Sequence, residues 1–224
     1  AYPDASHPAI KDISMDIQPG ERVCLTGQNG SGKHTLLKLL SGILTEYEGS
    51  LIYNGVSMRD LDITTLRNYL SMNFPNQEIF DGTILENLTM GRAGITLELV
   101  KDALEKLHLT EEIAQLLDVL ATSIISGGRH FSLSFVTKIA LARCLLTQPK
   151  LLLYTDALRQ IERSERIRII EFLTDPAHDW TLVVLSNDPA FMGACDRVVV
   201  LEEGQIIAEG PYKTVLKHVA TLEN

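Results

Sequence analysis

The sequence predicts an α/β fold with a mostly parallel sheet, antiparallel strands near its N-terminal end and an inserted α-helical subdomain. Short apolar runs rich in Val, Ile and Leu recur at 151–154, 181–186 and 197–210. The first two are apolar throughout, which is typical of strands covered on both faces. Segments with leucines at three- and four-residue spacing alternate with these runs, as helices do. Apolar strands that alternate with helices indicate a parallel sheet.

The first predicted elements are a strand, a helix and a hairpin. The run ERVCLTG at 21–27 is a short apolar strand that ends in glycine, and KHTLLKLLSGIL at 33–44 has the leucine spacing of a helix. GSLIYNGVSM at 49–58 is predicted as two strands joined at Asn54-Gly55, because this dipeptide favours a tight turn.

The middle of the chain is predicted to be helical. From about residue 83 to 122 the pattern has helical periodicity, for example in TLELVKDALEKLHL. VTKIALARCLLTQ at 136–148 is predicted as a further amphipathic helix, which Pro149 ends.

The size of the chain fits one domain. It has 224 residues, of which 45% are hydrophobic, and this length is enough for one sizeable core. We predict a single domain over 1–224, with a core at about 1–74 and 145–224 and a helical subdomain at about 75–144. The chain opens on AYPD without a start methionine, so we expect it to be part of a longer protein.

Charge and hydropathy exclude two classes of function. Lys and Arg number 20 against 29 Asp and Glu, which gives a net charge of −9. Because a phosphate backbone selects basic surfaces, we expect no nucleic-acid partner. No run of 18 apolar residues occurs in the sequence, so we expect that this chain does not itself cross a membrane.

The stretch GQNGSGKHT at 27–35 carries most of the pattern of a phosphate-binding loop, which is G-x-x-x-x-G-K followed by Ser or Thr. We expect backbone N–H groups from Gly30 to Lys33 to hold phosphates at a helix N-terminus, and Lys33 to add a point charge. A simple Gly-rich turn is the alternative. The candidate binding residues are Gly27, Asn29, Gly30, Ser31, Gly32, Lys33, His34 and Thr35.

The residue after Lys33 departs from this pattern. His34 occupies the place of the hydroxyl that binds magnesium. Magnesium takes oxygen ligands, and imidazole is a poor substitute. The hydroxyl of Thr35 points about 100° away around the helix. We therefore expect that a nucleotide can be held while Mg²⁺ is held poorly.

Four segments together carry a resemblance. They are YPDASHPAIKDISMDIQPGERVCLTGQNGSGKHTLL, LRNYLSMNFPNQEIFDGTILENL, KIALARCLL and DRVVVLEEGQIIAEG. In this order and spacing they resemble the nucleotide-binding domain of an exporter-type ABC transporter, from Tyr2 to about Leu216. The resemblance implies a P-loop NTPase-like core with ATP as ligand. Each piece alone is a weak signal, and their order is highly specific.

The resemblance implies roles for further residues. Tyr2 takes the position that stacks on adenine, with an exposed aromatic at a frayed terminus as the alternative, and Thr35 the position that contacts phosphate. ISGGR at 125–129 is similar to the signature motif but lies six residues too early. Counting back from IALAR places FSLSF at 131–135 there instead, where Ser132 keeps the hydroxyl and Leu-Ser replaces two glycines.

The positions that the family uses for catalysis are substituted. In LLLYTDALRQIE, Thr155 takes the place of the metal-binding Asp and Asp156 the place of the Glu that polarises water. In a register shifted by one, Asp156 binds the metal and Ala157 replaces the base. Either way one carboxylate is missing, and loss of a general base removes roughly 10²–10⁴ in rate.

Two more family positions are changed. The glutamine position falls on Pro75, which has neither a side-chain amide nor an N–H. The switch histidine falls on Asn187, which can hydrogen-bond a γ-phosphate but cannot titrate. We therefore expect no complete metal site, with Asp156 and Gln77 as candidate ligands.

The resemblance implies an ATP-binding cassette domain of an ABC exporter that couples nucleotide binding to transmembrane transport, with weak or absent hydrolysis. Its implied partners are a membrane domain, through Phe80–Asn87, and a second nucleotide-binding domain in a homo- or heterodimer. The implied location is the cytoplasmic face of the plasma or inner membrane. Two alternatives stay open, namely a slow but competent ATPase that uses Lys33, Asp156 and Ser132, and a nucleotide-free scaffold or docking module.

Overall fold

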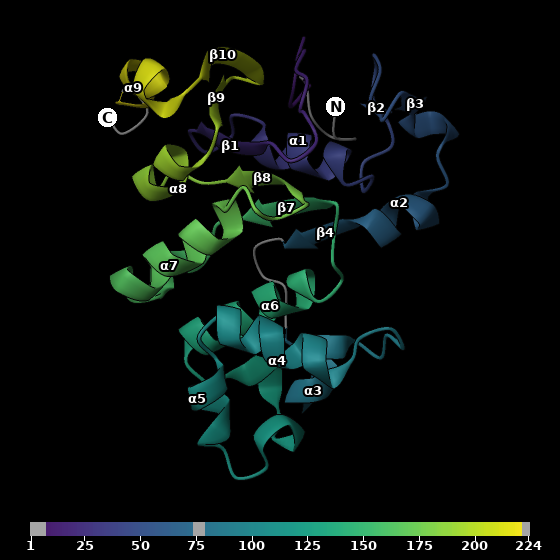
Figure 1. The fold of residues 1–224 in the computed structure, drawn as a ribbon. Coiled ribbons are helices and arrows are strands. Elements are labelled where there is room, and N and C mark those ends of the chain that lie inside the picture. The colour runs from purple at the N-terminus through teal and green to yellow at the C-terminus, as the bar shows by residue number, and fades with distance from the viewer. Residues whose placement is uncertain (1–7, 74–78, 221–224) are drawn as a thin grey trace. The chain divides into compact units, whose positions relative to one another are not determined.

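A six-stranded sheet organises the computed structural model, which describes residues 8–73 and 79–220 (Figure 1). The strand order is β10-β9-β1-β8-β7-β4. β1 runs parallel to both of its neighbours, β8 and β9, while β10 at the edge is antiparallel to β9. The strands are β1 (Arg22–Gly27), β4 (Leu70–Asn73), β7 (Leu151–Thr155), β8 (Thr181–Leu185), β9 (Arg197–Glu202) and β10 (Gln205–Gly210). The predicted α/β class with a mostly parallel sheet is confirmed.

The described residues group into two compact units. The first contains residues up to 72, then 150–154 and 174 onwards, and the second contains 73–149 and 155–173. The predicted boundaries, with a core at about 1–74 and 145–224, stay a prediction.

In the first unit, the central strands form the core. All six residues of β1 are buried, as are Leu182–Leu185 of β8 and Val198–Leu201 of β9. The runs of Val and Leu in β8 and β9 suit strands with both faces covered. The other elements of this unit are α1 (Lys33–Leu40), β2 (Ile52–Tyr53), β3 (Val56–Ser57), η1 (Met58–Asp60), α2 (Ile63–Tyr69), α8 (Pro189–Ala194) and α9 (Tyr212–Ala220).

The small elements of this unit follow their local sequence. β2 and β3 form the predicted antiparallel hairpin, with Asn54 at φ 49° and Gly55 at φ 81° in its turn. Asp62 begins α2, because its carboxylate accepts hydrogen bonds from the N–H groups of Thr64 and Thr65. β9 and β10 form the predicted closing hairpin, and α9 packs against both strands.

The second unit is mainly helical. Its elements are β5 (Gly82–Thr83), α3 (Ile84–Thr89), α4 (Leu97–Lys106), α5 (Thr110–Ala114), η2 (Val119–Ala121), β6 (Ser123–Ile124), η3 (Ser126–Gly128), α6 (Leu133–Leu145), η4 (Leu158–Gln160) and α7 (Arg163–Thr174), the last residue of which belongs to the first unit. α6 contacts α3, α4 and η4. It is buried on almost every side from Phe135 to Cys144, so the amphipathic helix that the sequence predicts here is instead a central helix of this unit.

The helix lengths bear on membrane insertion. Throughout 8–73 and 79–220, every helix falls short of the length and apolarity that crossing a bilayer requires.

Candidate phosphate site

A glycine-rich loop connects the buried strand β1 to helix α1 in the first unit. Gly30 has φ 85°, and Gly32, the residue that precedes α1, has φ 95°. Left-handed values like these favour glycine. An added Cβ on Gly32 would lie 2.5 Å from the carbonyl oxygen of Ala9, whereas one on Gly30 would meet no described heavy atom within 4 Å. The loop is therefore packed from behind at Gly32 and open at Gly30.

The ammonium group of Lys33 is enclosed by acceptors of its own loop. Its Nζ donates hydrogen bonds to the carbonyl oxygens of Gly27 and Gln28, both at 2.7 Å, and to Oγ of Ser31 at 3.1 Å. The residue is only 9% exposed, and this burial lowers the pKa of Lys33. The lysine therefore closes the loop and places a positive charge within it.

The loop borders a hollow of about 260 Å³. Its lining residues are Ala9, Asn29, Gly30, Ser31, Gly32, Lys33, His34 and Thr35. The structure thus brings together the predicted candidates from 29 to 35, and Gly27 lies directly before them at the end of β1. The hollow also lies at the N-terminal end of α1, and the backbone N–H groups and the dipole of a helix favour anions at this end.

Two segments distant in sequence support the back of the loop. The N–H of Gly204, in the β9–β10 turn, donates to the carbonyl oxygen of Ser31 at 3.2 Å, and the N–H of Lys11 donates to the carbonyl oxygen of Gly204 at 2.8 Å. Sequence reasoning missed Ala9, Lys11 and Gly204. Of these three, only Gly204 could have been suspected from the sequence, because a glycine in the turn of the closing hairpin indicates a special backbone conformation or a close approach.

His34 is an exposed residue in the first turn of α1. Partial burial of its ring lowers the pKa of His34, and the positive charges of Lys33 and Lys38 lower it further. The imidazole is therefore neutral near pH 7, so it offers a nitrogen lone pair and one N–H but no oxygen. Thr35, the next residue, is half-buried.

Asn187 follows β8 in the same unit and is exposed. Its Oδ1 accepts a hydrogen bond of 2.7 Å from Oγ1 of Thr26, which lies on β1 directly before Gly27. Sequence reasoning selected Asn187 and missed Thr26.

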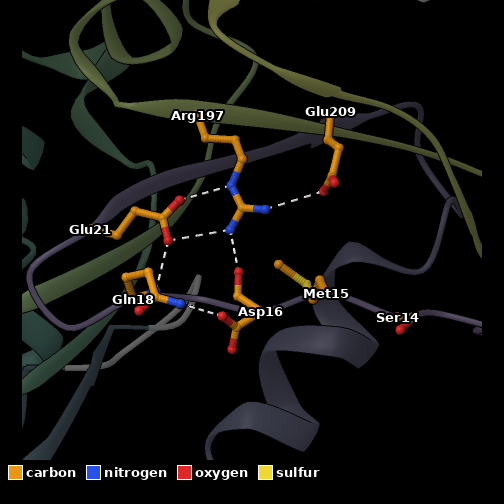
Figure 2. Close-up of a pocket in the computed structure, with 7 residues that line it drawn as sticks. All are labelled: Ser14, Met15, Asp16, Gln18, Glu21, Arg197 and Glu209. Atoms are coloured by element: carbon orange, nitrogen blue, oxygen red, sulfur yellow. Dashed lines mark hydrogen bonds and ion pairs between the residues drawn. The ribbon is translucent and has the colours of Figure 1, made fainter.

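A second, more open hollow of about 600 Å³ contains charged residues that pair with one another (Figure 2). Arg197 donates from Nε to Oε1 of Glu21 at 2.8 Å and from Nη1 to Oε2 of Glu209 at 3.2 Å. It also donates to the carbonyl oxygen of Asp16. Figure 2 shows the guanidinium group between the two carboxylates. Arg197 therefore ties the segment before β1 to β9 and β10, which is a structural role.

The second unit contains the predicted strand-end residues. Thr155 ends β7, and its hydroxyl oxygen is buried without a hydrogen-bond partner among the described residues. Oδ1 of Asp156 accepts a hydrogen bond of 2.9 Å from the N–H of Leu158, which begins η4. Asp156 thus stabilises a local turn with at least one of its oxygens.

Ser132 is the N-cap of α6. Its Oγ accepts a hydrogen bond of 3.0 Å from the N–H of Phe135, and a hydroxyl that accepts in this way can still donate its own proton. Leu133, which replaces a signature glycine in the resemblance, is 60% exposed.

The region Phe80–Asn87 is fixed by a buried amide. Asn87 is fully buried. It accepts at Oδ1 from the N–H of Phe80 at 3.1 Å and donates from Nδ2 to the carbonyl oxygen of Phe80 at 2.9 Å. Nη2 of Arg143 also donates to Oδ1 of Asn87 at 3.0 Å. Phe80 itself is 40% exposed, so this region presents an aromatic ring on a rigid base. Sequence reasoning missed Arg143.

Three predicted residues, Tyr2, Pro75 and Gln77, lie outside the described residues.

Comparison with known proteins places these observations in a family context. Residues 10–158 match the family model described as ABC transporter. The ATP-dependent lipid A-core flippase of Francisella tularensis subsp. tularensis is 28% identical over 212 residues, which cover 94% of this chain and 35% of that protein. The ABC transporter aclQ of Aspergillus oryzae is 29% identical, over 95% of this chain and 26% of that protein.

The fold is likewise similar to that of a solved structure. A bacterial Atm1-family ABC exporter with ATP bound superposes with a TM-score of 0.90 at 23% identity, over 100% of this chain and 39% of that one. The chain therefore spans about a third of the length of the relatives that it matches.

Proposed function

Because this chain belongs to the ABC transporter family, we propose that it is the ATP-binding cassette domain of an exporter, coupling ATP binding to transmembrane transport with weak or absent hydrolysis. The observation that carries this proposal is a glycine-rich loop at Gly27–Lys33, which the ammonium group of Lys33 holds together by hydrogen bonds, followed directly by the imidazole of His34. The loop supplies N–H donors and a positive charge, which bind phosphate. His34, the next residue, lacks the oxygen ligand that magnesium prefers.

ATP binding is supported by the chemistry of the hollow. Main-chain N–H groups at the start of α1 and the charge of Lys33 are the donors that triphosphates use. The open side of the loop at Gly30 lets a phosphate approach the backbone closely. A hollow of about 260 Å³ holds the phosphate end of a nucleotide, while the base would lie beyond it.

Weak binding of Mg²⁺ is supported by the side chains at the metal positions. Magnesium selects oxygen ligands in an octahedral arrangement, but His34 presents nitrogen and Thr155 presents a hydroxyl. Oδ1 of Asp156 already accepts a backbone hydrogen bond. Within 8–73 and 79–220 no three or more His, Cys, Asp or Glu residues form a group that could hold a metal. The residues present do not fit this ion.

Weak hydrolysis follows from the same positions. Thr155 and Asp156 supply one carboxylate where the family uses one for the metal and one for the attacking water. A missing general base removes about 10²–10⁴ in rate, and a poorly held metal reduces it further. Asn187 cannot take up a proton as a histidine does.

The partners are proposed from two surfaces. A membrane domain would dock on Phe80–Asn87, where Arg143 and Asn87 hold the backbone beneath the exposed ring of Phe80. A second nucleotide-binding domain, in a homo- or heterodimer, would approach Ser132 at the N-terminus of α6. With such partners the chain would lie on the cytoplasmic face of the plasma or inner membrane.

Calorimetric titration with ATP, once with Mg²⁺ and once with EDTA, tests the proposal. We expect wild type to bind with similar affinity in both buffers. Lys33→Met removes three donated hydrogen bonds and the loop charge, and should weaken binding by at least about tenfold. Lys101→Met removes the same charge from an exposed site on α4 and should bind like wild type.

Each alternative function predicts a different result. A wild type that binds no ATP in either buffer would favour the scaffold, because the loop would then hold no ligand. Binding that disappears in EDTA would contradict the expected independence from metal. Phosphate release that is clear in wild type and lost in Lys33→Met would favour the slow ATPase.

A further inference from the structure

Asn187 is hydrogen-bonded to Thr26, the residue directly before the glycine-rich loop. β8 pairs with β1 in parallel, and Leu185 is the partner of Leu25 in the register. The N–H of Ser186 continues this ladder by donating to the carbonyl oxygen of Leu25 at 3.1 Å. Beyond the end of β8, the two segments are joined by the hydrogen bond that Oγ1 of Thr26, directly before Gly27, donates to Oδ1 of Asn187. Both residues belong to the first compact unit.

The backbone around Asn187 is held on both sides. Ser186 is fixed by its ladder hydrogen bond, and its Oγ accepts a hydrogen bond of 2.9 Å from the N–H of Asp188. Oδ1 of Asp188 then caps α8 by accepting from the N–H of Ala190 at 2.9 Å. The freedom that remains at Asn187 is therefore mainly the rotation of its side chain.

Thr26 restricts that rotation with one hydrogen bond. It is 1% exposed, and its Oγ1 donates to Oδ1 of Asn187 at 2.7 Å. A buried hydroxyl needs a partner, and here the partner is one particular atom of the carboxamide. Because the oxygen of the amide faces Thr26, the Nδ2 group with its two N–H donors is turned away from Thr26.

We propose that Thr26 is a positioning residue, whose hydroxyl orients Asn187 so that its amide N–H groups donate to the terminal phosphate of a nucleoside triphosphate. This inference rests on the proposed function, because it assigns a partner to a residue beside the proposed phosphate site. The amide is a neutral donor and does not titrate. The hydrogen bond therefore forms only when the third phosphate is present, and it involves no transfer of a proton. A diphosphate offers no oxygen at that place.

The test is the ratio of ATP affinity to ADP affinity, measured by calorimetry in EDTA on the 224-residue chain. Thr26→Val keeps the shape of the side chain and removes the hydroxyl. We expect ATP binding to weaken about threefold to tenfold, the usual worth of one hydrogen bond, while ADP binding stays unchanged. Thr26→Ser keeps the donor and should retain most of the wild-type ratio.

A double-variant cycle separates positioning from stability. Asn187→Ala should lower the ratio at least as far as Thr26→Val does, and the double variant should match Asn187→Ala alone. Thermal unfolding should show Thr26→Val to be no less stable than wild type, because its hydroxyl serves an exposed partner.

Several outcomes would overturn the inference. Equal weakening of ATP and ADP by Thr26→Val would indicate a structural role, and an unchanged ratio would indicate no role. Additive effects of the two substitutions would show that Thr26 does not act through Asn187. A wild type that binds neither nucleotide would overturn the proposed function first, and this inference with it.

Discussion

Replacing Gly32 by alanine tests whether packing behind the phosphate loop holds its shape. Gly32 has φ 95° and ψ −3°, and an L-residue in a left-handed conformation loses about 1–2 kcal/mol. The added Cβ would also lie 2.5 Å from the carbonyl oxygen of Ala9 and 2.8 Å from Cγ2 of Ile10. Because the first of these atoms belongs to the backbone, the segment must move, which costs a further ~1–3 kcal/mol. The expected loss of unfolding free energy is about 2–5 kcal/mol.

Two other glycines supply matched controls. Gly30 has φ 85°, but an added Cβ there meets no described atom within 4 Å, so Gly30→Ala should lose only the conformational term of about 1–2 kcal/mol. Gly94 has neither a left-handed φ nor a described neighbour within 4 Å of an added Cβ, so Gly94→Ala should change stability by less than about 0.5 kcal/mol.

Urea unfolding measures the three variants, with the slope m compared to confirm that the transitions are equivalent. The expected order of destabilisation is Gly32, then Gly30, then Gly94. Calorimetric titration should also show that Gly30→Ala binds ATP more weakly than wild type even under conditions where the variant is fully folded. We expect this because the added methyl group enters the open side of the loop. If Gly32→Ala were no more destabilising than Gly30→Ala, the contact with Ala9 would not support the loop, and the reasoning would fail.

Three further predictions concern charged and titrating groups. His34→Ser supplies a hydroxyl oxygen, so calorimetry should show ATP binding about tenfold tighter with Mg²⁺ than in EDTA; equal affinities would contradict it. The pKa of His34 is lowered in the folded chain, so below the ordinary value of 6.5 the unfolded chain binds more protons. The free energy of unfolding should therefore fall as pH drops from 7 to 5, and it should fall less steeply in His34→Ser. If urea unfolding gave wild type and His34→Ser the same dependence on pH, this prediction would be refuted. Lys138, with a side chain 4% exposed, pairs with Glu165 at 2.9 Å and Glu112 at 3.2 Å. Lys138→Met should lose about 3 kcal/mol, and Glu165→Gln added to it should recover part of the loss in urea unfolding.

The glycine-rich loop between β1 and α1, which we propose to hold phosphate, could be located from the sequence because its residues are contiguous. Residues 27–35 form one motif, and the strand before it and the helix after it are visible as an apolar run and a leucine periodicity. Ala9 and Gly204 could not be predicted, because they reach the loop through the tertiary fold and bring only backbone atoms to it. Backbone contacts leave almost no mark on residue type, apart from the preference for glycine where space is short.

The helix at 136–148 shows why a periodicity can mislead. Its polar residues suggest one solvent-facing side, and the structure instead buries three of them in α6, namely Thr137, Lys138 and Arg143. Lys138 is paired with carboxylates of α5 and α7, and Nε of Arg143 donates to the carbonyl oxygen of Asn87 at 2.8 Å. A buried charge that has partners looks the same in a sequence as an exposed one, so only tertiary contacts distinguish the two.

The residues of the proposed phosphate site differ in how strongly each one argues for a ligand. Lys33 satisfies the carbonyl groups of Gly27 and Gln28, so folding alone gives it a role whether or not phosphate binds. The hydroxyl of Thr26 has no comparable role, since its partner on Asn187 is exposed and could bond to water instead. A valine would fill the same buried volume on β1. We therefore expect the hydrogen bond between Thr26 and Asn187 to affect triphosphate binding more than it affects folding stability. For this reason, the ratio of ATP affinity to ADP affinity in Thr26→Val tests function more directly than the affinity lost in Lys33→Met.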